Sequence, residues 1–258
     1  MHAELRAGVR NGLPLGLAAV VLLLPLGDAR TLAPAPSAGV ARAAVRAPAQ
    51  VPAPLPVAAT AAFGDSPASS DVRAVADWIA ASRDNGRRAF AILDKRAARL
   101  YVFDAEARLG GSTLVLLGSA TGDDSVPGIG ERPLAQVRAA ERTTAAGRFV
   151  SVPGHDDQGE PVVWVDYAAA LAMHRVKVVD PAERRFERIA TDSVADKRIS
   201  NGCINVPLGF FDDVVEPALG HAQAIVYVLP ERKPLQAVFP AAHAHAARAQ
   251  PPDPAPPG

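Results

Sequence analysis

Apolar residues recur at two different spacings between residues 70 and 230. Ser70-Asp71 is typical of a helix N-cap, and the apolar residues that follow lie three or four apart until Asn85-Gly86, so the sequence predicts a helix over residues 71–85. From residue 89 the spacing becomes strand-like, with turn residues between the apolar runs. We expect strands at residues 90–92, 100–102, 114–117, 148–152, 162–165, 170–179 and 224–229, and a helix at residues 209–218.

These elements predict one mainly β domain, with a few helices at its margins, over residues 70–232. Residues 1–29 combine a weakly basic start with an apolar run, which predicts a signal peptide and an exported protein; an uncleaved membrane anchor is the alternative. Residues 30–69 are rich in alanine and proline and are interpreted as a linker. Residues 233–258 are interpreted as a disordered tail, because alanine, histidine and proline dominate them.

Charge excludes one class of partner. The chain has 27 basic and 27 acidic residues, so we expect no nucleic-acid surface.

The sequence contains no complete cofactor-binding motif. The Gly128-Ile129-Gly130 segment begins like a dinucleotide-binding loop but lacks the third glycine of that motif and is followed by Pro133. No phosphate loop, paired-cysteine metal site or His-Glu-x-x-His motif is present, and we therefore expect neither a metal nor another cofactor.

The chain contains one cysteine, Cys203, within Ser200-Asn201-Gly202-Cys203-Ile204-Asn205. A single cysteine in an exported protein has no partner for an intramolecular disulfide, so the thiol is either incidental or reactive. Glycine before the cysteine allows a tight turn from which backbone N–H groups of Gly202 and Cys203 can point at a developing oxyanion. A reactive thiol also needs a base, and histidine suits that role.

Three histidines of the predicted domain are candidate bases: His155, His174 and His221. His155 lies in a predicted turn and His221 follows a predicted helix end, whereas His174 lies at the end of the apolar run 168–173. A rigid strand would hold an imidazole in a fixed position, so His174 is favoured. A surface or core packing role is the alternative for each of the three.

The motif around Cys203, with His174 upstream, resembles the signature of L,D-transpeptidases, the family with a YkuD-like catalytic domain that cross-links bacterial peptidoglycan. Residues 90–95 and 99–104 resemble the family's opening hairpin, and residues 144–149 resemble its Thr-Pro-x-Gly-x-Phe segment. The resemblance covers residues 89–229. It implies an L,D-transpeptidase-like β-sandwich, no cofactor, a periplasmic or cell-envelope location, and peptidoglycan stem peptides as partners, with carbapenem-type inhibitors as further ligands.

The resemblance also implies roles for individual residues. Cys203 would be the nucleophile and His174 the general base and acid, with the Gly202 backbone as oxyanion donor and Ser200 shaping the loop and orienting the imidazole through a nearby carbonyl. Asn205, Asn201 and Trp164 are the candidate substrate-binding residues. The thiol would attack a tetrapeptide stem, expel D-alanine and form a thioester that an amine acceptor resolves.

Two features depart from the family pattern. Asn201 stands where the family has histidine, and Asn201 does not titrate. The spacer after His174 carries a charged insertion over residues 180–188, in which Arg184, Arg185 and Arg188 would either meet substrate carboxylates or, the favoured interpretation, lie in a solvated loop. The alternatives to a transpeptidase are an L,D-carboxypeptidase that uses water as acceptor, an inactive wall-binding module, and a cysteine hydrolase of another fold in which His174 pairs with a residue other than Cys203.

Overall fold

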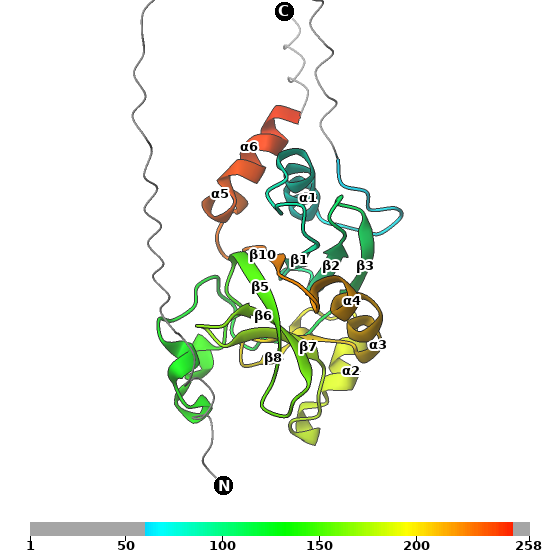
Figure 1. The fold of residues 1–258 in the computed structure, drawn as a ribbon. Coiled ribbons are helices and arrows are strands. Elements are labelled where there is room, and N and C mark those ends of the chain that lie inside the picture. The colour runs from blue at the N-terminus through cyan, green and yellow to red at the C-terminus, as the bar shows by residue number, and fades with distance from the viewer. Residues whose placement is uncertain (1–59, 250–258) are drawn as a thin grey trace, which may run out of the picture. The chain divides into compact units, whose positions relative to one another are not determined.

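The computed structural model describes residues 60–249, and its main element is a sheet of eight strands (Figure 1). Their order is β3-β2-β1-β10-β5-β6-β7-β9, and β4 and β8 form a second, two-stranded sheet. The predictions for residues 1–29, for 30–59 of the linker and for 250–258 of the tail lie outside the described residues. The strands are β1 (Phe90–Asp94), β2 (Arg99–Phe103), β3 (Leu109–Leu114), β4 (Leu117–Gly118), β5 (Gly147–His155), β6 (Pro161–Asp166), β7 (Leu171–Arg175), β8 (Arg198–Ser200), β9 (Ile204–Val206) and β10 (Ala224–Val228).

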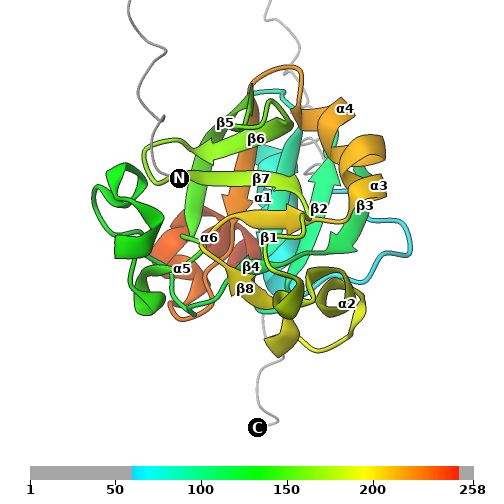
Figure 2. The same cartoon turned by 90° about the horizontal axis from the view of Figure 1, so that it is seen from below.

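The long strand β5 divides the large sheet into two halves. Its first part, residues 147–151, pairs with β10, and its second part, residues 152–155, pairs with β6. Strands that pass from one sheet to another in this way make the corners of β-sandwiches. The two halves, β3-β2-β1-β10 and β6-β7-β9, can therefore face each other across a common core (Figure 2).

That core is one cluster of buried apolar side chains contributed by both halves. Side chains alternate between the two faces of a strand, so alternate residues of the strands that line this core enter it. Its strand members include Ala91, Leu93, Leu100, Val102, Val226 and Val228 from one half and Val163, Val165, Leu171, Met173, Ile204 and Val206 from the other. The mainly β, sandwich-type architecture predicted from the sequence is confirmed.

A second apolar cluster lies on the opposite face of β1, β2 and β10, where helices cover it (Figure 1). These are α1 (Ser70–Ser82), α5 (Leu235–Val238) and α6 (Pro240–Ala249). The N-cap of α1 is Ser69, one residue before the predicted position, because its side chain accepts the N–H of Val72. The helix ends before Asn85, at Arg83, which adopts the left-handed conformation.

The structure corrects the predictions for both flanks of the domain. Residues 235–238 and 240–249 are helical, and Leu235, Phe239 and Ala242 are buried against α1 and the sheet. Phe63, assigned to the linker, is 6% exposed and contacts the ring of Phe103 edge-on at 5.3 Å between centroids. The folded unit thus extends beyond residues 70–232 at both ends.

The remaining α-helices lie in the connections between β7 and β8 and between β9 and β10. They are α2 (Arg185–Ala190), α3 (Leu208–Phe210) and α4 (Glu216–Leu219), with a π-helical turn, Phe211–Val215, between the last two. The predicted helix at 209–218 is therefore present, with this turn inside it. Two other predictions shift. The strand expected at residues 114–117 is replaced by β3, which ends at Leu114, and β4, which begins at Leu117; β7 ends at Arg175, where its pairing with β9 ends.

Candidate functional site

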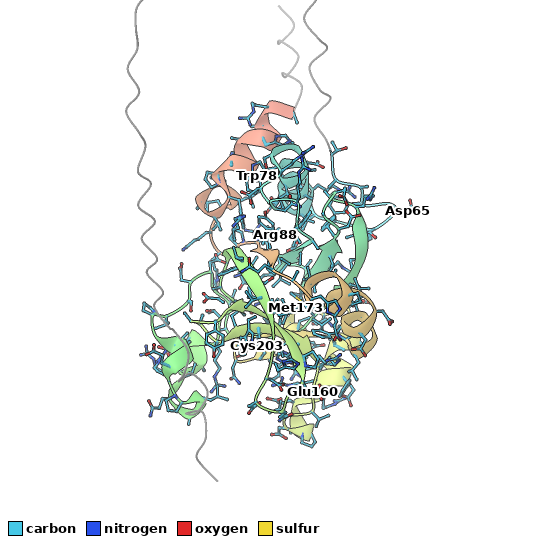
Figure 3. All side chains as sticks on the ribbon, in the orientation of Figure 1. Asp65, Trp78, Arg88, Glu160, Met173 and Cys203 are labelled. Atoms are coloured by element: carbon cyan, nitrogen blue, oxygen red, sulfur yellow. The ribbon has the colours of Figure 1, made fainter. Side chains whose placement is uncertain are left out.

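His174 and Cys203 lie on neighbouring parallel strands. Residue His174 of β7 is opposite Asn205 of β9, and Met173 is opposite Ile204. Cys203 immediately precedes β9 and is two residues from Asn205, a spacing that puts both side chains on the same side of a strand. Pairing of these strands therefore brings together two residues that are far apart in the sequence, and Figure 3 labels Cys203 near Met173 of β7.

The Cys203 thiol is half-buried against the start of β7. Its Sγ–H points at the carbonyl of Ala170, with 3.4 Å between sulfur and oxygen. Burial raises the pKa of the thiol, while the backbone N–H of Ala172 and the charge of Arg185 act to lower that pKa. The resting group is therefore a protonated thiol with two groups beside it that favour the thiolate.

The imidazole of His174 is held in one tautomer. Its Nδ1 lies 2.7 Å from the carbonyl oxygen of Arg175, which accepts only, so Nδ1 carries the hydrogen and Nε2 keeps a free lone pair. Nε2 accepts a long hydrogen bond, 3.4 Å, from the Asn205 amide. Burial lowers the pKa of His174, and the nearby Lys177 and Arg185 lower it further, so the ring is neutral at pH 7.

Among the described residues, Cys203 and His174 form no hydrogen bond with each other. Asn205 is hydrogen-bonded to both. Asn205 is fully buried, and its Nδ2 donates to the carbonyl of Cys203, at 3.4 Å, as well as toward His174. This pairing of His174 with another residue is the arrangement that the sequence analysis associated with a cysteine hydrolase. Asn205 thus contacts both the imidazole of His174 and the backbone of Cys203, and its role in substrate binding stays a prediction.

A buried arginine completes the site. Arg185 of α2 is 7% exposed, and its Nη1 donates to Asn205 Oδ1 at 2.7 Å. Its Nε donates to Glu183 at 2.6 Å. The favoured expectation of a solvated loop is wrong for Arg185, because the insertion folds back on β9. Arg184 stays exposed, and Arg188 donates to backbone carbonyls of Glu183 and Asp196.

The loop before Cys203 is fixed by short hydrogen bonds. Ser200 Oγ donates to the carbonyl of Cys203 at 2.6 Å and accepts the N–H of Gly202 at 3.1 Å. The Gly202 N–H is therefore occupied, which contradicts its predicted use as an oxyanion donor. The carbonyl that orients His174 belongs to Arg175, so the predicted orienting role near Ser200 is also corrected.

Other candidate residues lie outside this group. Asn201, His155 and His221 are exposed, and within residues 60–249 none of them hydrogen-bonds to Cys203 or His174. Trp164 is half-buried on β6 and packs edge-on against exposed Tyr167, with 5.1 Å between ring centroids. Its indole also lies against the backbone of Gly154. Sequence reasoning missed Thr144 as a contact of this loop; it donates to the Gly202 carbonyl at 2.7 Å.

The described part of the chain contains no group of three or more histidine, cysteine or acidic residues that would hold a metal ion. Among residues 60–249 there is also no helix with the length and apolar character needed to cross a membrane. The site offers a thiol, a neutral imidazole with Nε2 unprotonated and the backbone N–H of Cys203, groups of the kind that acyl transfer through a thioester uses.

Comparison with known proteins gives limited results. No protein-family model and no curated protein matches the sequence. Among solved structures, the helical cell shape determining protein Pgp2 from Campylobacter jejuni matches with 12% identity and a TM-score of 0.38, over 71% of this chain and 64% of that one. The catalytic domain of an Enterococcus faecium L,D-transpeptidase matches with 14% identity and a TM-score of 0.30, over 55% of this chain and 98% of that one. The present chain thus spans 64% of the length of the first structure, and at these values neither match establishes a shared activity.

Proposed function

We propose that this protein is a cysteine acyltransferase that acts on peptidoglycan stem peptides, as an L,D-transpeptidase. The observation that carries the proposal is the placement of His174: it lies on the strand paired with the segment that follows Cys203, and its contact with the Arg175 carbonyl leaves Nε2 unprotonated. The motif Ser200-Asn201-Gly202-Cys203-Ile204-Asn205 supplies the link to stem peptides. The location proposed for this activity is the periplasm or cell envelope, reached through the segment 1–29.

The first step is attack by Cys203 on the peptide carbonyl that precedes the terminal D-alanine. Rotation of the thiol away from Ala170 brings its proton to His174 Nε2, which releases the long bond from Asn205. The S–C bond forms as the carbonyl π pair moves to oxygen, and collapse of that oxyanion breaks the C–N bond. The imidazolium gives its proton to the departing D-alanine amine, leaving a thioester on Cys203.

The second step transfers the acyl group. An acceptor amine attacks the thioester carbonyl, His174 takes the amine proton, the C–S bond breaks and the thiolate leaves, to be reprotonated by the imidazolium. Neutral imidazole is the form that both steps need at their start, and the lowered pKa of His174 keeps it in that form.

A second candidate is hydrolysis of the same thioester by water. The contact between His174 Nε2 and the Asn205 amide favours this candidate, because a Cys-His-Asn set also occurs in cysteine hydrolases. Water in place of the amine would give a tripeptide stem and free D-alanine, which makes the protein an L,D-carboxypeptidase. Product analysis separates the two acceptors.

The test of the nucleophile is acylation by a carbapenem, whose strained lactam carbonyl resembles the scissile carbonyl. The purified full chain is incubated with imipenem at pH 7 and its intact mass is measured, with Cys203→Ala as the matched control. The proposal expects one adduct on the wild type and none on Cys203→Ala. Absence of any adduct, together with retention of the protein on isolated peptidoglycan, would favour the inactive wall-binding module.

The test of the reaction uses tetrapeptide muropeptides as the only substrate. Cross-linked dimers with release of D-alanine would identify the transpeptidase, and tripeptide with release of D-alanine would identify the carboxypeptidase. Equal product from Cys203→Ala and wild type would overturn the mechanism in either form.

A further inference from the structure

The peptide unit between Gly202 and Cys203 is held by Thr144. The Thr144 hydroxyl accepts the backbone N–H of Gly118, at 3.0 Å, and lies 2.7 Å from the carbonyl oxygen of Gly202. A carbonyl has no hydrogen to give, so the single hydroxyl hydrogen must point at Gly202. Thr144 is fully buried, which leaves no water to compete for this bond.

This contact determines where the N–H of Cys203 points. The carbonyl of Gly202 and the N–H of Cys203 belong to one planar unit, and the described backbone contains no cis peptide, so the two groups point in opposite directions. The N–H is thus directed away from Thr144. Gly202 has a φ of 132°, a conformation that suits glycine, and this allows its carbonyl to turn toward Thr144.

Two backbone N–H groups, those of Gly202 and Cys203, are expected to donate to an oxyanion, and that of Gly202 already has an acceptor. The N–H of Gly202 donates to Ser200 Oγ, whereas the N–H of Cys203 has no acceptor among residues 60–249. A free backbone donor one residue from the sulfur is the kind of group that stabilises a tetrahedral oxyanion. Its direction depends on the bond between Thr144 and Gly202.

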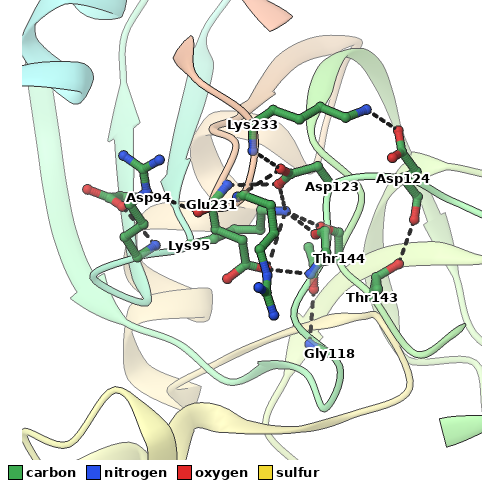
Figure 4. A network of polar contacts seen from close by, with 12 residues as sticks. Asp94, Lys95, Gly118, Asp123, Asp124, Thr143, Thr144, Glu231 and Lys233 are labelled. Atoms are coloured by element: carbon green, nitrogen blue, oxygen red, sulfur yellow. Dashed lines mark hydrogen bonds and ion pairs between the residues drawn. The ribbon is translucent and has the colours of Figure 1, made fainter. Parts of the chain in front are cut away.

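Thr144 is itself fixed by a buried ion cluster (Figure 4). Its carbonyl accepts Lys95 Nζ at 2.8 Å, and the same ammonium donates to Asp123 Oδ1 at 2.8 Å and to the Gly122 carbonyl at 2.6 Å. Asp123 also accepts backbone N–H groups of residues 231–233. The Lys95 side chain has no exposed surface, and its hydrogen bond to the Thr144 carbonyl holds the backbone of residue 144 in place.

We propose that Thr144 is a positioning residue for acyl transfer: its hydroxyl holds the Gly202–Cys203 peptide so that the Cys203 N–H serves as the oxyanion donor. This inference rests on the proposed function and deepens it. Loss of the hydroxyl frees the peptide to rotate, which removes a donor needed when the thiol attacks a carbonyl. Alkylation of the same thiol forms no oxyanion and does not need that donor.

The experiment compares two reactions of Cys203 in the full chain. Acylation by imipenem and alkylation by iodoacetamide are followed by intact mass in wild type, Thr144→Val and Thr144→Ser. Thr143→Val is the matched control, because the Thr143 hydroxyl donates to Asp124 and not to the Cys203 loop. Thermal unfolding and circular dichroism establish that each variant is folded.

For Thr144→Val we expect acylation to slow by about 100- to 1,000-fold, the usual effect of losing one oxyanion donor, with alkylation within about twofold of wild type. Thr144→Ser keeps the hydroxyl and is expected to acylate at nearly the wild-type rate, as is Thr143→Val. Equal slowing of both reactions in Thr144→Val, or failure of serine to restore acylation, would show a structural role only and overturn the inference.

The outcomes separate this inference from the function on which it rests. Normal acylation in Thr144→Val would overturn the role of Thr144 and leave the acyltransferase proposal intact. No acylation of the wild type would overturn the acyltransferase proposal, and the positioning role with it.

Discussion

Arg185 Nη1 and Asn205 Oδ1 are joined by a 2.7 Å hydrogen bond, which anchors a buried guanidinium near the thiol of Cys203 and the imidazole of His174. Burial raises the pKa of Cys203 and lowers that of His174; the positive charge of Arg185 opposes the first shift and adds to the second. Both effects have the same physical origin, because a cation favours the thiolate and disfavours the imidazolium. Through Arg185, the insertion of residues 180–188 thus supplies a positive charge to the site.

Arg185→Gln should raise the pKa of Cys203, because the variant keeps an N–H donor for Asn205 but loses the charge. The pH dependence of alkylation by iodoacetamide reports this pKa directly, and its midpoint is expected to move to higher pH. Arg184→Gln is the matched control, since Arg184 is exposed and 71% of its side chain is accessible. A midpoint that stays in place in Arg185→Gln would show that the guanidinium has no effect on the thiol.

Protonation of His174 should slow acylation at low pH, which gives the pH–rate profile an acid limb. Burial lowers the pKa of this imidazole below its usual 6.5, so the neutral base is lost only as pH falls below 6.5. We expect the imipenem acylation rate to be constant near pH 7 and to decline toward lower pH. His174→Gln should remove the acid limb and slow acylation by about 100- to 10,000-fold, the range for general bases. An acid limb that persists in His174→Gln would assign it to another group.

Protonation of His174 should also make the stability of the folded protein depend on pH. Because the imidazole binds its proton less readily in the folded protein than in the unfolded chain, its contribution to stability is complete above pH 6.5 and declines as pH falls below that value. Urea unfolding of wild type and His174→Gln across pH 4–8 measures this dependence. A wild-type curve parallel to that of the variant would exclude the contribution.

Asp123→Asn should destabilise the fold strongly. Hydrogen bonds from Lys95 and from the N–H groups of residues 231–233 outweigh burial and hold the pKa of this carboxyl well below its usual 3.8. Removal of its charge leaves Lys95 buried beside Glu231 alone, at 3.6 Å, and we expect a loss of about 3–5 kcal/mol. Asp124→Asn is the control: that side chain is 75% exposed, and its ion pair with Lys233 should contribute about 0–1 kcal/mol.

The helices after residue 235 should contribute to stability. Phe239 is 4% exposed against the sheet and α1, so Phe239→Ala is expected to lower the free energy of unfolding by about 3–5 kcal/mol. Leu208→Ala is the control, because Leu208 is 45% exposed. Equal denaturation midpoints for both variants would show that α5 and α6 add nothing to the core.

The strands were predictable because their apolar residues alternate, as in 90–92 and 100–102, and this pattern identified most of the sheet. The helix at 240–249 was not, because it is made mostly of alanine and histidine and buries only Ala242. In the site, glycine before Cys203 and the apolar run before His174 indicated two residues that the structure places on neighbouring strands. Arg185 and Thr144 gave no local signal, since their roles arise from contacts across 20 and 58 residues of sequence.

The parallel pairing of β1 with β10 has a consequence for how the chain reaches its fold. Phe90 is opposite Ile225, so the centre of the large sheet joins its first strand to its last. A growing chain cannot complete that sheet until residue 228 is available, and pairings so distant in sequence close slowly. We therefore expect the domain to fold cooperatively only after β10 has been synthesised. Until then β1 and β2 can pair only as a hairpin.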